Sequence, residues 1–440
     1  MQTSPRDSTK PSAAIGLDFG TTNSALAFGQ RGESTLATFA RTDGTRLSTF
    51  RSVLFFEAPD RGPAPPVIAG PRALERYFET GGNGRLLQSL KSFLASPLFT
   101  STSVYGRTYT LEELVSLLLL RLRKEVEAEH GPIGGRVVMG RPVRFVSEEE
   151  GEGEGLPLTR LRKAAALAGF DDVRFEYEPV AAAHSYERTL DHDELVLVGD
   201  FGGGTSDFCL VRLGPSRRRG VLERNSAIVG TEGVGLAGDA FDGEIVRAVV
   251  APALGAGGMF RSFMEQREIP IPPWIYERLR RWHHVSFLKS ADTMRFLKEL
   301  RSLALERDKI EALVHLVEDD LGPQLFTAVE GTKVALSRES SHTLAFDDPP
   351  TVLDELCHRV DFERWIATDL RAIERCIDAL FDKSNVRASD VDRVFLTGGS
   401  ALVPSVRAIF ERRFGEDKLR GGEELTSVAT GLALVADEER

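Results

Sequence analysis

The sequence predicts an α/β protein built from two similar halves that face each other. In residues 195–205 (LVLVGDFGGGT), an apolar strand runs into an acidic residue and then a turn of three glycines. Residues 15–22 (IGLDFGTT) repeat the pattern of apolar strand, Asp-Phe-Gly and small-residue turn, and a second apolar strand follows each turn. One such turn near the start of each half indicates a duplicated fold. The length of 440 residues is enough for two or three domains.

The two turns have the chemistry of a phosphate site. Consecutive glycines have no Cβ to block a phosphate, and their N–H groups can converge on its oxygens. Thr205 adds a hydroxyl, and Asp200 at the strand end can hold Mg²⁺ directly or through water. A single turn of this kind is equally consistent with a tight hairpin that binds nothing. The repeat at Asp18 predicts that the two turns contact phosphates from opposite sides, with Asp18 and Asp200 beside a metal.

Composition narrows the class of protein. The formal net charge of −11 argues against a nucleic acid or a membrane surface as partner. The three cysteines are too scattered for a disulfide framework or a zinc site, which fits a reducing cytoplasm. Residues 1–12 are polar, so we expect a disordered tail rather than a signal peptide. The longest leucine run, 117–120, is far too short to span a bilayer.

The elements of the first half follow from its patterning. A strand pair covers residues 13–28, and further strand-like runs lie between 35 and 56. Thr110 is expected to cap a long amphipathic helix that Gly131 ends. Glu178 stands where a strand meets a helix, a position that favours binding sites in open α/β sheets. The remaining expected elements are a strand at 136–143, a helix at 161–168, a strand at 173–177 and a helix at 180–186.

The second half opens with the strand pair around the three glycines. We expect a strand at 225–229, a glycine-rich loop at 230–238 that carries Glu232, a helix at 241–250 and an extended helical region at 271–329. Positions 330, 333 and 337 would share one helix face. The strand at 394–396 ends in a Thr-Gly-Gly-Ser turn, whose small residues allow a flat ring or a ribose to approach the backbone. Helices at 403–410 and 427–436 complete the chain.

Taken together, these turns and the strand–Glu–Pro break resemble the actin-like ATPases with the duplicated ribonuclease-H fold. Three sequence motifs resemble those of the ATPase domain of the DnaK-type heat-shock chaperones. They are residues 18–24 (DFGTTNS), 200–205 (DFGGGT) and 396–404 (LTGGSALVP). The long helical insert is most similar to the YegD-type branch of that family. The resemblance implies two lobes around a nucleotide cleft: lobe I at 13–190 plus 423–440, with a smaller subdomain near 35–110, and lobe II at 191–422, with a helical insert at 251–329.

The resemblance also implies roles for particular residues. Asp18 and Asp200 match the carboxylates that hold Mg²⁺ through its water shell, and Thr205 lies near the γ-phosphate. Glu178 matches an acidic residue near the attacking water. Asp207 is either a second candidate for orienting that water or a structural strand cap. Lys91 is the candidate catalytic lysine, with an ordinary surface lysine as the alternative. The implied contacts to ATP or ADP come from a first phosphate loop (Gly20, Thr21, Thr22, Asn23), a second phosphate loop (Gly202, Gly203, Gly204, Thr205), an adenosine helix (Glu330, Lys333, Ser337) and an adenosine loop (Gly398, Gly399, Ser400).

The sequence differs from that family in ways that affect the function expected of this protein. Nine residues follow Gly431, so no peptide-binding domain is expected and ordinary refolding by peptide capture is not implied. Val334 and Leu402 stand where the family usually carries arginines against the adenosine. The expected function is an ATP-hydrolysing, chaperone-like switch, an ATPase acting on an unidentified protein partner. The alternatives are a nucleotide-sensing interaction protein with negligible hydrolysis and a small-molecule kinase, which would need an acceptor pocket containing a catalytic aspartate.

Overall fold

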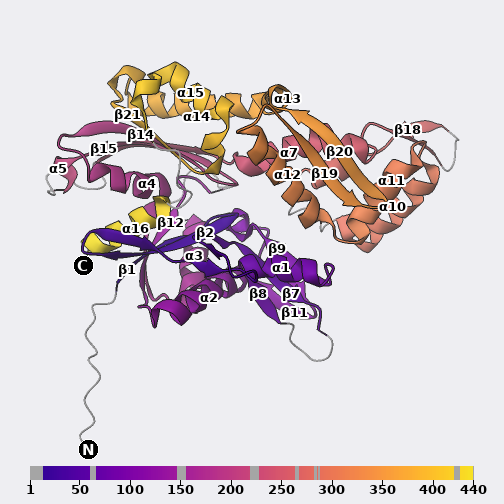
Figure 1. The fold of residues 1–440 in the computed structure, drawn as a ribbon, viewed down its shortest axis with the longest axis horizontal. Helices are drawn as coiled ribbons and strands as arrows, with labels where there is room; N and C mark the ends of the chain where they lie inside the picture. The colour runs from indigo at the N-terminus through magenta and orange to yellow at the C-terminus, as the bar shows by residue number, and fades with distance from the viewer. Residues whose placement is uncertain are drawn as a thin grey trace, which may run out of the picture.

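The computed structural model describes residues 13–59, 66–145, 155–218, 227–262, 267–281, 285, 288–420 and 427–439. The tail expected at residues 1–12 lies outside them. The described chain forms two large sheets, each with its own set of helices (Figure 1). Among the helices of these ranges, none combines the length and the apolarity that a bilayer crossing requires.

The first large sheet contains the first Asp-Phe-Gly turn. Its strand order is β13-β12-β1-β2-β3, and the short β6 also pairs with β2. The first hairpin is antiparallel, whereas β12 and β13 add in parallel. Helix α2 covers this sheet with an apolar face that carries Leu111, Leu118 and Leu122. The bounds are β1 Ala14–Asp18, β2 Asn23–Gln30, β3 Glu33–Leu36, β6 Phe50–Arg51, β12 Arg136–Arg141, β13 Asp172–Tyr177, α2 Leu111–His130 and α3 Gly155–Leu167.

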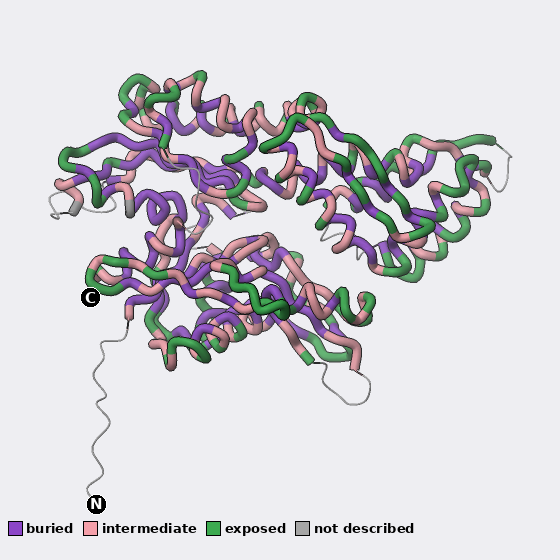
Figure 2. Tube along the Cα trace, viewed as in Figure 1, coloured by how far each residue is buried: buried purple, intermediate pink, exposed green. Residues whose placement is uncertain are grey.

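The second large sheet contains the three-glycine turn and repeats the pairing pattern of the first. Its order is β16-β15-β14-β21-β22, with an antiparallel three-strand meander and two strands added in parallel. β14 is buried along its whole length (Figure 2), as expected for a central strand covered on both faces. The bounds are β14 Glu194–Phe201, β15 Ser206–Leu213, β16 Ile228–Val234, β21 Arg393–Thr397, β22 Leu419–Arg420, α5 Pro215–Arg218, α14 Ala367–Ser384, η4 Ala388–Asp390, α15 Pro404–Phe414 and η6 Glu416–Lys418.

Two helices, α4 (Glu178–Glu187) and α16 (Ser427–Glu438), connect the two sheets. α4 packs Val180 and Ala183 on β14 and β15, and its Ala181 and Ala182 meet α16. α16, at the C-terminal end of the described chain, lies beside β1 (Figure 1). Small residues allow this approach, because a Cβ on Gly431 would collide with the Ala181 backbone. The last helix therefore packs on the first sheet.

A smaller region extends from the first sheet. The three-stranded sheet β8-β7-β9 packs Val53 and Phe55 under α1, against Ala73 and Tyr77. The 3₁₀ helix η1 then leads away from β9. The bounds are β4 Phe39–Ala40, β5 Arg46–Leu47, β7 Val53–Glu57, β8 Val67–Ala69, α1 Pro71–Glu79, β9 Gly84–Gln88, η1 Leu90–Phe93, β10 Ser101–Val104 and β11 Arg107–Thr110.

An outer region of helices and one long hairpin extends from the second sheet, and exposed residues are frequent on its surface (Figure 2). Its core joins Leu297, Leu313 and Leu325 to Leu344 of the hairpin β19–β20. The bounds are α7 Gly238–Ile245, the π-helical turn η2 Val246–Val250, α8 Ala251–Ala253, β17 Met259–Arg261, β18 Glu268–Pro270, α9 Trp274–Leu279, α10 Ala291–Leu303, α11 Arg307–Glu318, α12 Gly322–Leu336, β19 Ser341–Asp348, β20 Thr351–His358 and α13 Arg359–Trp365.

Several local predictions are confirmed and two are wrong. Thr110 caps α2 through a capping box with Glu113, and Gly131 follows the last helical residue. Glu232 does not lie in a loop. Residues 228–234 form β16, because they pair with β15, and a β-bulge at Leu210/Val211 sets their register. The stretch 251–329 is not wholly helical, because β17 and β18 pair within it.

Candidate functional site

A cavity of about 280 Å³ lies between the two sheets, and we call it the central cavity. It is lined by the ends of β1 and β14, the N-terminus of α4, one face of α12 and the turn after β21. Apart from Asp207, the residues that the sequence predicts for the site line it: Asp18, Gly20, Thr21, Thr22, Asn23, Lys91, Glu178, Asp200, Gly202, Gly203, Gly204, Thr205, Glu330, Lys333, Ser337, Gly398, Gly399 and Ser400.

The two small-residue turns face each other across this cavity. A Cβ added to Gly203 would lie 2.5 Å from Thr22 Oγ1, so only glycine allows the second turn to approach the first this closely. Gly202 N–H donates to Thr205 O at 3.0 Å and closes the second turn. Asp239 N–H donates to Gly203 O at 2.8 Å and ties that turn to the start of α7. The second turn is therefore held by hydrogen bonds within itself and to the start of α7.

Buried carboxylates gather at the base of the cavity. Burial, and then the charge of Glu178, raises the pKa of Asp18 to about 7, although the Lys91 ammonium opposes the rise. Burial also raises the pKa of Asp200 well above its ordinary value, with further repulsion from Glu178, Asp207 and Asp18. Such shifts arise when like charges share a site that water barely reaches. The positive charge of Lys91 does not compensate for the carboxylates of this cluster.

Lys91 lies inside this cluster and not on the surface. Its Nζ donates to Glu178 Oε1 at 2.6 Å, and both side chains are more than nine-tenths buried. Burial by itself would lower the pKa of Lys91, but the carboxylates of Glu178 and Asp18 outweigh it and raise that pKa. Lys91 is thus a charged ammonium fixed beside the strand ends. The 3₁₀ helix η1, which carries Lys91, packs its Leu90 into the same core as α2.

Asp207 lies on β15, opposite Asp200 in the antiparallel register. Its Oδ1 accepts the backbone N–H of Arg144 at 3.1 Å, which is the contact of a structural cap. Burial, and then the charge of Glu178, raises its pKa to about 7. It does not line the central cavity, and this favours the structural role among the two that the sequence left open.

The opposite end of the cavity is formed by α12 and the turn after β21. Lys333 Nζ donates to Asp242 Oδ2 at 2.8 Å and to Gly238 O at 3.2 Å. Ser337 is the C-cap residue just beyond the end of α12, yet it still lines the cavity. Gly398 has φ 86°, and a Cβ there would collide with the Phe201 backbone, so this turn requires glycine.

Sequence reasoning missed three charged side chains of this cavity: Arg51, Asp239 and Asp242. Arg51 comes from β6, and the two aspartates come from α7. Each is an ordinary charged residue within a run of mixed composition, so local sequence carries no signal for it. Val334 and Leu402, which the resemblance sets at positions where arginines are expected, are each 47% exposed. Val334 lines the cavity and offers an apolar surface.

The lining charges suit a divalent cation together with an anionic ligand. Three cationic side chains and six carboxylates line the cavity, so the carboxylates exceed the cations. Within the described ranges, no three His, Cys, Asp or Glu side chains are grouped so as to bind a metal ion directly. A Mg²⁺ ion that keeps several waters and takes its other ligands from phosphates needs only one or two carboxylates. Asp18 and Asp200 fit that requirement.

Comparison with known proteins identifies the family. A model of the Hsp70 protein family matches residues 96–254 and 298–437, more than half of the chain. The chain therefore belongs to the Hsp70 family, and with it to the actin-like ATPase fold. The chaperone protein DnaK of Thermosipho africanus (strain TCF52B) is 24% identical over 431 residues, which cover 97% of this chain and 59% of that protein. DnaK of Thermosipho melanesiensis is 24% identical over 433 residues, covering 98% and 60%. The chain thus spans about three fifths of the length of these relatives.

Proposed function

We propose that the chain binds Mg²⁺–ATP in the central cavity and hydrolyses it, and that the bound nucleotide sets the conformation presented to a protein partner. The observation that carries this proposal is the approach of Gly203 to Thr22. It brings the two small-residue turns together, and an aspartate stands at the end of the strand before each turn. Membership of the Hsp70 family supports the same assignment.

In this proposal, the two turns bind the phosphates through backbone N–H groups, with hydroxyls from Thr21, Thr22 and Thr205. Asp18 and Asp200 hold the Mg²⁺ water shell. The metal, when bound, neutralises phosphate charge and orients the phosphoryl group. The high pKa values of these aspartates support this role, because burial and then mutual repulsion raise them, and a bound cation would offset both.

Lys91 and Glu178 act as a pair in the proposed hydrolysis. Lys91 Nζ stabilises the charge that develops on the transferred phosphoryl group, since a fixed buried donor needs no reorganisation. Glu178 Oε1 accepts from Lys91 and orients the attacking water as a weak base. Phosphoryl transfer to water requires chiefly such positioning and charge stabilisation. Glu330, Lys333 and Ser337 on one side, and Gly398, Gly399 and Ser400 on the other, bind the nucleoside.

The proposed lobes follow the two sheets. Their identical order of antiparallel and parallel strands supports a duplicated ribonuclease-H fold, with lobe I at 13–190 plus 423–440 and lobe II at 191–422. The smaller region near 35–110 and the insert at 251–329 then lie on either side of the cleft. Because α4 and α16 join the sheets through small residues, slight sliding there would open or close the cavity. We also propose that the protein acts in the cytoplasm and has no nucleic-acid or membrane partner.

The test is phosphate release from Mg²⁺–ATP by the wild type and by Asp200→Asn, with and without candidate small-molecule acceptors. We expect release that depends on water and is lost in Asp200→Asn. Tight ATP binding without release would favour the second candidate, a nucleotide sensor, for which the apolar Val334 and Leu402 are the specific observation. Phosphate transferred to an acceptor would indicate a kinase. Absence of ATP binding by the wild type would refute the site assignment.

A further inference from the structure

Arg51 is a cation of the central cavity that none of the proposed roles includes. It lies on β6, whose backbone pairs with the start of β2, so that Arg51 stands opposite Asn23. The next residue, Ser52, donates its N–H to Thr22 O at 2.9 Å. The backbone of Arg51 is thus attached directly to the first of the two facing turns.

The guanidinium of Arg51 reaches across the cavity. Its Nη2 donates to Glu330 Oε2 at 3.0 Å, and Glu330 belongs to α12 in the other half of the molecule. The Arg51 side chain is 28% exposed, whereas those of Lys91 and Lys333 are 9% and 13% exposed. Of the three cations lining the cavity within the described residues, Arg51 is therefore the one with most access to a solvent-borne ligand.

The chemistry of arginine suits a phosphate at this place. The guanidinium is planar and always charged, and it carries five N–H donors arranged in a fork that matches phosphate oxygens. The contact with Glu330 engages Nη2, which leaves donors on the other nitrogens for a ligand. The contact with Glu330 holds the guanidinium at the cavity lining, to which both residues belong.

We propose that Arg51 is a further nucleotide-contacting residue, whose guanidinium, directed by Glu330, donates to a phosphate of the bound nucleotide. This inference rests on the proposed function, since it assumes a nucleotide in the cavity. Arg51 then links α12 to a phosphate that the two turns bind. The affinity for ATP depends on Arg51 itself, and Glu330 acts as its positioning residue.

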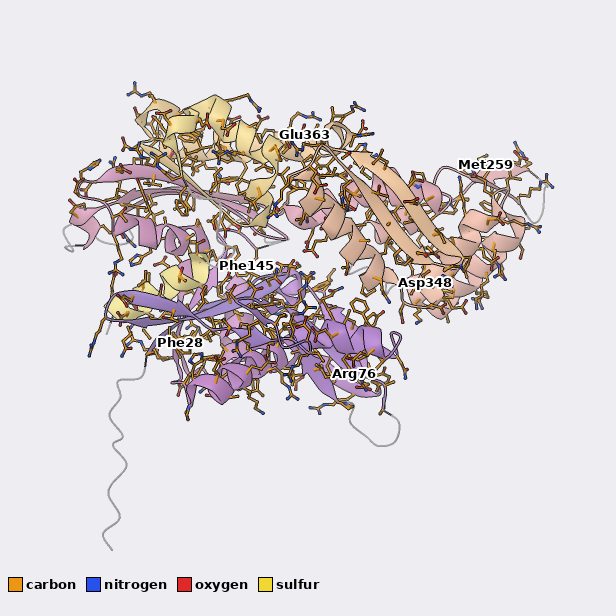
Figure 3. All side chains as sticks on the ribbon, viewed as in Figure 1. Phe28, Arg76, Phe145, Met259, Asp348 and Glu363 are labelled. Atoms are coloured by element: carbon orange, nitrogen blue, oxygen red, sulfur yellow. The ribbon has the colours of Figure 1, made fainter. Side chains whose placement is uncertain are left out.

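The experiment compares Mg²⁺–ATP, Mg²⁺–ADP and adenosine binding, by titration or by competition against a fluorescent ATP analogue. The variants are Arg51→Met, Arg51→Lys and Glu330→Gln. The control is Arg76→Met, which breaks a similar ion pair between α1 and Glu57 of β7, away from the cavity lining (Figure 3). Thermal unfolding of each variant verifies folding.

We expect Arg51→Met to weaken ATP binding by about tenfold to a hundredfold, the equivalent of a lost charge-assisted hydrogen bond. Adenosine binding by Arg51→Met stays unchanged, and Arg51→Lys recovers part of the ATP affinity. Glu330→Gln weakens adenosine binding as well, because Glu330 is also proposed to bind the nucleoside. Arg76→Met binds like the wild type. ATP binding by Arg51→Met within about twofold of the wild type overturns the inference.

An equal loss of ATP and adenosine binding in Arg51→Met also overturns it, because Arg51 would then only hold the two halves together. In both of these cases the wild type still binds ATP, so the proposed function survives. A wild type that binds no ATP refutes the proposed function first, and the role of Arg51 with it.

Discussion

Replacement of Asp18 by Asn is expected to stabilise the ligand-free protein at alkaline pH while it abolishes Mg²⁺-dependent nucleotide binding. Asp18 has an ordinary pKa of 3.8, and burial together with the charge of Glu178 raises it to about 7 in the folded chain. The folded state thus keeps a proton that the unfolded chain has released. Stability is therefore lost as the pH rises from about 4 to about 7, and the whole loss is present above pH 7.

The size of this effect follows from the pKa values. The rise from 3.8 to about 7 corresponds to at most about 4 kcal/mol of unfolding free energy, at 1.36 kcal/mol per pKa unit. Asn has no charge to bury, so Asp18→Asn does not lose this stability. We expect similar melting temperatures for wild type and variant near pH 4, and a variant that melts several degrees higher at pH 8.

The assay is thermal unfolding from pH 4 to 8, with and without Mg²⁺–ATP. The control is Asp43→Asn: Asp43 is an exposed acid whose pKa is lowered by its hydrogen bonds from Thr45, so its replacement should not stabilise the protein at pH 8. Mg²⁺–ATP should raise the melting temperature of the wild type, by mass action, but not that of Asp18→Asn. An Asp18→Asn variant that melts at or below the melting temperature of the wild type at pH 8 would refute this reasoning. The charged Asp18 carboxylate would then not destabilise the ligand-free protein.

Three further changes test other parts of the site. Lys91→Ala leaves Glu178 buried without its cation, so we expect a lower melting temperature and single-turnover phosphate release reduced by at least about a hundredfold; release at the wild-type rate would exclude Lys91 from catalysis. Gly203→Ala places a Cβ against Thr22 Oγ1 and should abolish ATP binding measured by titration, whereas Gly331→Ala on α12, with open space around it, should bind normally. Leu402→Arg should strengthen ATP binding by about 1 kcal/mol through stacking on the base, and unchanged affinity would argue that residue 402 does not face the nucleoside.

The sequence determined the parts of this protein that depend on local patterning. The two Asp-Phe-Gly turns, the capping box at Thr110 and the Gly-Gly-Ser turn are each defined by a few adjacent residues whose backbone conformation or hydrogen bonds are specific. The repeat of one turn, and the resemblance built on it, also brought Glu330 and Lys333 into the site. The structure places Asp18, Asp200, the Gly-Gly-Ser turn, Glu330 and Lys333 around one cavity.

Tertiary structure decided what depends on residues far apart in the chain. Lys91 could be a surface lysine until packing of η1 buries it against Glu178, 87 positions away. Arg51 reaches Glu330 across 279 positions, and Asp242 meets Lys333 across 91. Glu232 lies on a strand and not in a loop because pairing with β15 overrides the local preference of glycine. Such pairs leave no local pattern, because a charged residue in isolation has the same sequence signature whether it meets water or a buried partner.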